Sequence, residues 1–323
     1  VYKRQRDHSE RSSFAVIELK NLYKSYRGKS VLMNISLTIQ DNEFFVLIGS
    51  SGCGKTTLLK TLNKLNPIDK GEILINGTPI NRIKVTQLPR LMGYVVQEGG
   101  LFPHMTVEDN IALAMRVAGY PKEKIYDRIT ELLELVNLEP DQYRSQYPSQ
   151  LSGGQRQRIG IARALAIEPE FIVCDEPISA LDVSIQSQVI NLLHDLQEKL
   201  GLTYLFIAHD LNIVKYISDR IAVMYLGNVV ELASSDELYK NTLHPYSQAL
   251  LSAVPIPDPS AEAQKHRIII SGDVPSPINT PKGCNFAGRC PKACDQCKES
   301  KPPLQEITPG HYVACHLVQP EKK

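Results

Sequence analysis

The most constraining feature of the sequence is a glycine-rich turn at residues 49–56, which follows an apolar run and precedes a segment with helical spacing. The run, FFVLIG, is typical of a strand buried on both faces of a parallel sheet. The turn matches G-x-x-x-x-G-K-[ST], in which backbone N–H groups and a helix N-terminus face a phosphate. We therefore expect an α/β fold with a nucleotide-binding loop. Its expected phosphate-binding residues are Gly49, Ser50, Ser51, Gly52, Cys53, Gly54, Lys55, Thr56 and Thr57.

Two side chains of the loop and two carboxylates farther along the chain predict phosphate chemistry. Lys55 is expected to reach the β and γ phosphates, and Thr56 to give its hydroxyl to Mg²⁺. The apolar run FIVC ends in Asp175 and Glu176. Asp175 is placed to hold Mg²⁺, which leaves Glu176 to polarise the attacking water. Alone, such a run is more often a strand that meets solvent, so its weight depends on the loop.

A third motif, LSGGQ at residues 151–155, lies between them. Ser152 and Gln155 form the S-x-x-Q pattern of a capping box at a helix start. Gly153 and Gly154 each cost about 1 kcal/mol relative to alanine inside a helix. The plain interpretation is a well-capped helix. The two glycines make sense if a phosphate must approach this helix N-terminus.

Composition excludes several classes of protein. The 323 residues carry 36 basic and 35 acidic side chains, and 42% are apolar, as in ordinary globular chains. This balance gives no electrostatic reason to expect nucleic acid. No run approaches the roughly 18–20 apolar residues of a membrane span, and residues 1–13 lack the apolar core of a signal peptide. We therefore expect a cytosolic chain of about two domains.

Periodicity places the remaining elements. Strands are expected within residues 14–50, at 171–174 and at 203–208, and a helix at about 183–199. The segment from 106 to about 136 has helical character, with Pro121 at a first helical position. Gly227-Asn228 predicts a hairpin turn. After about residue 235 the pattern fades into a proline-rich segment.

In this order, the glycine-rich loop, LSGGQ and FIVCDEP resemble the ATP-binding cassette of ABC transporters over residues 14–235. The resemblance implies a P-loop NTPase fold with a RecA-like core sheet and a helical subdomain at about 97–165. It also implies ATP and Mg²⁺ as ligands. Residues 1–13 would form a flexible tail, and residues 236–323 a small, loop-rich, cysteine-containing extension.

The family resemblance implies further site residues. Tyr26 sits where an aromatic ring stacks on adenine, and Gln97 matches the residue that senses Mg²⁺ and the membrane partner. Asp182 matches the D-loop, and His209 matches the switch histidine that holds the γ-phosphate. In this family two cassettes pair head to tail, so that LSGGQ of one closes over ATP bound to the other. The expected catalytic residues are Lys55, Gln97, Glu176 and His209, and the expected Mg²⁺ ligands are Thr56, Gln97 and Asp175.

From about residue 169 onward the chain resembles the ATPase subunits of oligopeptide and dipeptide importers. The resemblance rests on CDEPISALDVSIQSQVINLL, HPYSQALLSAVPIPDP and GDVPSPINTPKGCNFAGRC. It implies peptide uptake by a complex with a second ATPase subunit, identical or different, and two transmembrane permease subunits. A substrate-binding protein would act indirectly, and no nucleic acid would bind. The subunit would lie peripherally at the cytoplasmic face of the plasma membrane.

The C-terminal cysteines suggest a metal. In the peptide importers, cysteines corresponding to Cys284, Cys290, Cys297 and Cys315 can hold an iron–sulfur cluster. Four thiolates suit [4Fe–4S], although the spacing matches neither common ferredoxin pattern. Zinc is the alternative, because Cys294-x-x-Cys297 has zinc-like spacing, and unligated thiols are the third interpretation. Cys294 falls outside the set of four and would be a bystander.

The segment before about residue 165 resembles a different branch, the cassettes of quaternary-amine importers. GYVVQEGGLFPHMTVEDNIALAMRVAGYPKEKI carries this likeness, so the chain looks like a mosaic. Peptide import remains the first hypothesis, because the tail motifs are rarer and the paired regulatory domains of the other branch do not follow the cassette. The alternatives are a quaternary-amine importer ATPase, a soluble ABC protein of DNA repair or translation, and a metal-binding module with a vestigial cassette.

Overall fold

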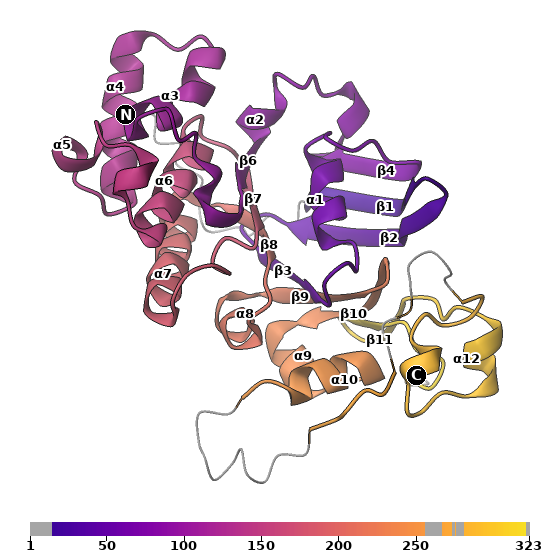
Figure 1. The fold of residues 1–323 in the computed structure, drawn as a ribbon. Coiled ribbons are helices and arrows are strands. Elements are labelled where there is room, and N and C mark those ends of the chain that lie inside the picture. The colour runs from indigo at the N-terminus through magenta and orange to yellow at the C-terminus, as the bar shows by residue number, and fades with distance from the viewer. Residues whose placement is uncertain (1–14, 256–266, 273–274, 276–280, 321–323) are drawn as a thin grey trace.

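The computed structural model describes residues 15–255, 267–272, 275 and 281–320, and its core is an eight-stranded sheet (Figure 1). Its order is β11-β12-β10-β9-β3-β8-β7-β6. The strands are β3 (Phe44–Gly49), β6 (Met92–Val95), β7 (Phe171–Asp175), β8 (Thr203–Ile207), β9 (Arg220–Tyr225), β10 (Asn228–Ser234), β11 (Gln305–Thr308) and β12 (His311–Val313). Neighbours from β6 to β9 are parallel, whereas β10 and β12 join antiparallel.

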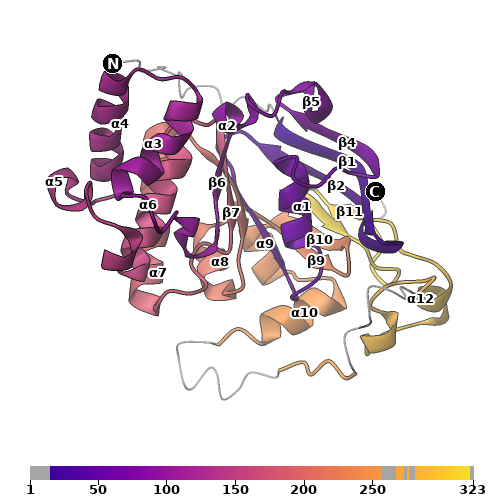
Figure 2. The ribbon, with the colours of Figure 1, turned by 45° about the horizontal axis from the view of Figure 1, so that its top comes forward.

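A second, antiparallel sheet of order β2-β1-β4-β5 lies beside the first (Figure 2). Its strands are β1 (Ala15–Tyr26), β2 (Lys29–Gln40), β4 (Lys70–Ile75) and β5 (Thr78–Pro79). The helices are α1 (Lys55–Leu62), α2 (Leu88–Leu91), α3 (Val107–Val117), α4 (Lys122–Leu135), α5 (Pro140–Tyr143), α6 (Gly153–Leu165), α7 (Val183–Leu200), α8 (Leu211–Ile217), α9 (Ser235–Lys240), α10 (Pro245–Ser252) and α12 (Asp295–Glu299). Helices α3 to α6 gather on the side away from the antiparallel sheet.

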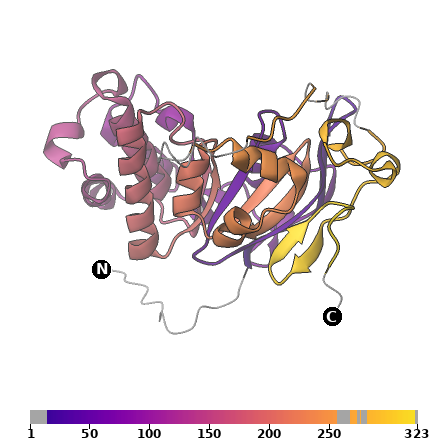
Figure 3. The ribbon, with the colours of Figure 1, turned by 90° about the horizontal axis from the view of Figure 1, so that it is seen from below.

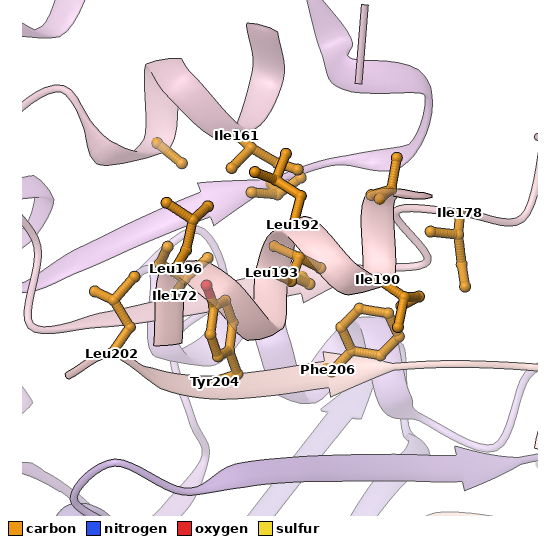
Figure 4. Close-up of a cluster of buried hydrophobic side chains, with 14 of the residues drawn as sticks. Ile161, Ile172, Ile178, Ile190, Leu192, Leu193, Leu196, Leu202, Tyr204 and Phe206 are labelled. Atoms are coloured by element: carbon orange, nitrogen blue, oxygen red, sulfur yellow. The ribbon is translucent and has the colours of Figure 1, made fainter. Parts of the chain in front are cut away.

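Both faces of the parallel strands are buried, as the apolar run at β3 predicts. Phe44, Val46 and Ile48 face one hydrophobic cluster, while Phe45 and Leu47 face another. The second cluster joins α1 and the antiparallel sheet to the core sheet. The first contains residues of α3, α4, α6 and α7, and Figure 4 shows α7 laid over β7 and β8 in it. This two-sided packing fixes where the loop after β3 emerges.

The structure confirms most expected elements and shifts two of them by one residue. Helix α7 and the capping box of Ser152 and Gln155 form as predicted. Pro121 is the N-cap of α4, with an extended ψ of 144°, rather than its first helical residue. The hairpin turn consists of Leu226 and Gly227, both with positive φ, and Asn228 already pairs in β10.

The region after residue 235 is more ordered than the sequence predicts. Helices α9 and α10 begin at the side-chain caps Ser234 and His244, and each is too short for a clear periodicity. Strand β12 pairs with β10, so this region extends the core sheet (Figure 3). Residues 1–13, expected to be a tail, lie outside the described residues. Among the described helices, none is both long and apolar enough to cross a bilayer.

Candidate nucleotide site

The candidate site lies at the carboxyl edge of the parallel strands, where open α/β sheets commonly bind ligands. The glycine-rich loop follows β3 and leads into α1. Asp175 ends β7, Glu176 follows it directly, and His209 comes two residues after β8. Gln97 comes two residues after β6. Adjacent parallel strands thus bring together residues that are far apart in the sequence.

The backbone conformation of the loop requires glycine at two positions. At Gly49, with φ of 150°, a Cβ would lie 2.2 Å from the carbonyl oxygen of Met224. Gly54 has φ of 108° and is the N-cap of α1, and a Cβ there would lie 2.9 Å from the carbonyl oxygen of Val31. The loop borders a pocket that Glu176 also lines. The sequence pattern therefore produces a backbone cradle next to a carboxylate.

Lys55 is buried inside this loop, with only 5% of its surface exposed. Its Nζ donates to the carbonyl oxygens of Gly49 and Ser50, at 2.8 and 3.2 Å. Cys53 is 1% exposed, and burial raises the pKa of its thiol. The Cys53 side chain therefore belongs to the core, and its Sγ also accepts a weak 3.8 Å hydrogen bond from the Lys55 ammonium.

Thr56 and Asp175 meet across the site. The hydroxyl of Thr56 donates to Oδ1 of Asp175 at 3.3 Å, and the hydroxyl of Tyr94 donates to Oδ2 at 3.3 Å. Burial raises the pKa of Asp175, the Tyr94 hydrogen bond opposes this, and the Glu176 charge adds to it. Hydroxyl and carboxylate oxygens are suitable ligands for Mg²⁺. Tyr94 escaped the sequence analysis, because nothing in YVVQ shows that β6 lies beside β7.

Glu176 and His209 form the second pair of the site. Nε2 of His209 lies 2.5 Å from Oε1 of Glu176, so the ring N–H can hold the carboxylate. Glu176 has a left-handed backbone, with φ of 50°. Gln97 donates to Oγ of Ser179 at 3.1 Å, and that hydroxyl donates to the carbonyl oxygen of Glu176. Gln97 is therefore linked to the turn after Glu176.

The structure places the remaining predicted residues away from this pair. Tyr26 is 39% exposed near the end of β1, with the Lys24 ammonium 5.2 Å from its ring centre. Asp182 caps α7 by accepting from the amide of Ile185. Ser152 and Gln155 cap α6. None of these side chains lines the pocket beside the loop.

The structure gives a reason within the chain for the LSGGQ glycines. A Cβ on Gly154 would lie 2.6 Å from Cγ2 of Ile185, and one on Gly153 would lie 3.1 Å from Cδ2 of Leu181. The close approach of α6 to the start of α7 therefore demands a small residue at Gly154. Packing within the chain accounts for a glycine at position 154 without a bound phosphate.

The motif HPYSQALLSAVPIPDP, which carries the resemblance to peptide importers, also supplies a contact to the site that its pattern does not predict. The hydroxyl of Tyr246, on α10, accepts a hydrogen bond from the amide of Ser50 at 2.9 Å. The two residues are 196 positions apart. No local pattern could have revealed this contact.

The C-terminal cysteines lie near one another, but their arrangement does not support the predicted metal site. Sγ of Cys294 lies 3.4 Å from Sγ of Cys297, and the amide of Cys284 donates to the carbonyl of Cys297. Burial raises the pKa of the Cys284 and Cys315 thiols. Among the described residues, no group of three or more histidine, cysteine or acidic side chains is placed to hold a metal ion.

Similarity to known proteins covers almost the whole chain. Residues 32–179 match the family described as ABC transporter, and residues 230–297 match the family described as oligopeptide/dipeptide transporter, C-terminal region. The putative oligopeptide transport ATP-binding protein YkfD of Bacillus subtilis is 50% identical over 311 residues, 94% of each chain. The oligopeptide transport ATP-binding protein OppF of Haemophilus influenzae is 45% identical over 316 residues, 94% of this chain and 93% of that one.

These relatives match on both sides of residue 165, so the likeness of the first half to quaternary-amine importers finds no support in them. Solved structures agree on the fold. The ATP-binding cassette MJ0796, in a dimeric post-hydrolysis state with ADP and phosphate, has a TM-score of 0.61 and 32% identity, covering 68% of this chain and 98% of that one. CbiO1 of Clostridium perfringens has a TM-score of 0.66 and 27% identity, covering 71% of this chain and 92% of that one. The chain therefore belongs to the ATP-binding proteins of ABC transporters, the ATP-hydrolysing subunits, in the group that carries the oligopeptide/dipeptide C-terminal region.

Proposed function

We propose that this chain binds and hydrolyses ATP to drive the import of peptides. The observation that carries the proposal is the match of residues 230–297 to the oligopeptide/dipeptide C-terminal region, joined to an ATP-binding cassette. Relatives named for oligopeptide transport match both parts together. The subunit would act at the cytoplasmic face of the membrane, bound to two permease subunits, with a substrate-binding protein acting through them.

In the proposed mechanism the loop holds the phosphates. The side chain of Lys55 has three N–H donors, of which the carbonyls of Gly49 and Ser50 occupy two. The third is directed to Sγ of Cys53 at 3.8 Å, a weak acceptor that a phosphate oxygen would replace, and the two carbonyl bonds restrict where the ammonium can point. Thr56 and Asp175 would hold Mg²⁺, which neutralises phosphate charge when bound. Exposed Tyr26 would stack on adenine.

Glu176 is the proposed general base, which takes a proton from the attacking water. The Nε2 of His209, 2.5 Å from the carboxylate, fixes its direction, and we assign His209 the contact with the γ-phosphate as well. Gln97, bonded to Ser179 beside Glu176, would report the state of the site to the membrane partner. Ser152, Gly153, Gly154, Gln155 and Asp182 would act on ATP held by a second cassette, because cassettes of this family pair head to tail.

The test of catalysis is Glu176→Gln, which keeps the shape of the side chain and removes the base. We expect ATP to bind, turnover to fall at least a hundredfold, and an ATP-bound dimer to accumulate on size-exclusion chromatography. His194→Gln is the control, because His194 sits on the exposed side of α7, where its ring lies 3.7 Å from Glu198. Turnover of Glu176→Gln near that of the control would remove Glu176 from this role.

The test of substrate class is reconstitution with candidate permeases in vesicles. We expect a peptide-loaded binding protein to stimulate ATP hydrolysis. Stimulation by a betaine-loaded binding protein, and none by a peptide-loaded one, would instead favour the quaternary-amine alternative while the ATPase assignment stands.

We further propose that the C-terminal cysteines bind a metal, with an iron–sulfur cluster on Cys284, Cys290, Cys297 and Cys315 as the first candidate and zinc as the second. The support is chemical: five thiols lie within 32 residues of sequence, and the contact of Cys294 with Cys297 favours the zinc alternative, because Cys294 lies outside the set of four. The proposed role is structural, because ATP hydrolysis needs no electron transfer.

A further inference from the structure

We propose that Tyr246 is a positioning residue for the ATP site, through which the C-terminal region holds the glycine-rich loop in its phosphate-binding shape. The inference rests on the phosphate-binding role proposed above for that loop. Its direct basis is the hydrogen bond from the Ser50 amide to the Tyr246 hydroxyl, 2.9 Å long.

The peptide groups of Ser50 are held from two sides. Its amide donates to Tyr246, and its carbonyl oxygen accepts from the Lys55 ammonium at 3.2 Å. Ser50 itself does not line the pocket, whereas Ser51 and Gly52 do. Tyr246 therefore fixes the first turn of the loop from behind, and leaves the pocket side to the ligand.

The hydroxyl of Tyr246 is itself held firmly in place. The residue is 3% exposed, and its ring packs against Tyr225 and Phe286, with ring centres 4.6 and 5.5 Å away. Such aromatic contacts stabilise beyond simple burial. A side chain confined in this way loses little freedom when it bonds the loop, so its acceptor is already positioned.

The backbone of Tyr246 is fixed by a buried network. Its amide donates to Nδ1 of His244, and burial lowers the pKa of His244 to about 4, so the ring is neutral and can accept. The amides of Leu243 and His244 donate to the carboxylate of Glu231 on β10. The start of α10 is therefore tied to the core sheet.

A second contact connects the cysteine-bearing segment to the same loop. The side-chain amide of Asn285 donates to the carbonyl oxygen of Leu226 and to Oδ1 of Asn228, at 3.0 and 2.7 Å. Within that hairpin turn, the amide of Gly227 donates to the carbonyl of Cys53 at 2.9 Å. Two routes thus run from the C-terminal region to the loop, and the route through Tyr246 is the shorter.

The decisive variant is Tyr246→Phe, which removes the hydroxyl and keeps the ring. The matched control is Tyr225→Phe, which removes a hydroxyl from the same ring cluster that receives only a 3.5 Å contact from Arg289. ADP affinity of the full chain is measured by calorimetry, because ADP reports on the loop without hydrolysis. We expect the ADP dissociation constant of Tyr246→Phe to rise about three- to tenfold, the range that one lost hydrogen bond gives. The ADP dissociation constant of Tyr225→Phe should stay within twofold of the wild-type value. The two variants should have equal melting temperatures.

Hydrogen exchange separates positioning from a merely structural role. In the wild type without nucleotide, the Ser50 amide should exchange more slowly than the Ser51 amide, and this protection should fall in Tyr246→Phe alone. An ADP affinity of Tyr246→Phe equal to that of the control would overturn the inference, and so would an unprotected Ser50 amide in the wild type. Failure of the wild type itself to bind ADP would instead overturn the proposed function of the loop.

Discussion

Replacing Gly154 with alanine tests whether packing against Ile185 or the approach of a bound phosphate requires glycine at this position. An added Cβ would lie 2.6 Å from Cγ2 of Ile185, well inside normal contact distance. Alanine in place of glycine gains about 1 kcal/mol of helix propensity. Overpacking of a buried contact costs about 1–3 kcal/mol. We therefore expect Gly154→Ala to lower the free energy of unfolding by up to about 2 kcal/mol.

The double variant Gly154→Ala/Ile185→Ala isolates the contact. With Ile185 shortened, the clash disappears and the propensity gain remains, so the two changes should couple by about 1–3 kcal/mol. The assay is urea unfolding of the four proteins in the cycle. Unfolding is monitored by far-ultraviolet circular dichroism, because the chain contains no tryptophan whose fluorescence could report it. Additivity within about 0.5 kcal/mol would refute the packing argument.

The same four proteins separate the two interpretations of LSGGQ in function. If packing alone requires glycine, the double variant should hydrolyse ATP nearly as fast as Ile185→Ala. If a phosphate on a second cassette must approach Gly154, the double variant should remain inactive although it is stable. Gly153→Ala is the milder control, since its Cβ would lie 3.1 Å from the flexible end of Leu181.

Two further predictions concern the C-terminal region. Protein purified without oxygen should be brown, with about four irons per chain, if a cluster is bound. Stoichiometric zinc and no visible absorption would favour the zinc alternative. Metal-free thiols would contradict both metal proposals. Burial disfavours the charged form of His311, but its contacts with Glu231 and Glu237 outweigh this and raise its pKa. The contacts of protonated His311 with the two glutamates should therefore stabilise the chain fully below about pH 6.5. This stabilisation should be lost as pH rises through the raised pKa of His311. His311→Gln should flatten that part of the profile of melting temperature against pH, and an unchanged slope would contradict the assignment.

The arrangement of the site was largely predictable, because it follows from sheet topology. Lys55, Asp175 and His209 each come at or just after the end of an apolar run. Parallel strands place all their carboxyl ends at one edge, so residues with this pattern must converge. The prediction succeeds because period and residue type, rather than a long-range contact, determine the position of each group.

The contacts that complete the site were not predictable, because they join distant segments through side chains of common types. Tyr94 reaches Asp175 because β6 pairs with β7, and Tyr246 reaches Ser50 because α10 packs on β9, where its ring meets Tyr225. The shift of the hairpin has a local cause. Leu226 adopts φ of 42°, which a sequence rule does not expect of leucine, so Gly227-Asn228 was taken for the turn.

The position of the C-terminal region also bears on how such a chain is divided. Sequence resemblance places a boundary at residue 235, yet β12 pairs with β10 across it and the Tyr246 hydroxyl bonds the loop after β3. The buried carboxylate of Glu231 accepts from the start of α10 and contacts His311 at 2.9 Å. Removing one partner of such a buried network leaves the other uncompensated, at a cost of several kcal/mol. A cassette cut at the boundary would therefore lose both a core hydrogen-bond network and the support of its phosphate loop. For this reason the C-terminal region belongs physically to the ATPase, whatever it contributes to the choice of substrate.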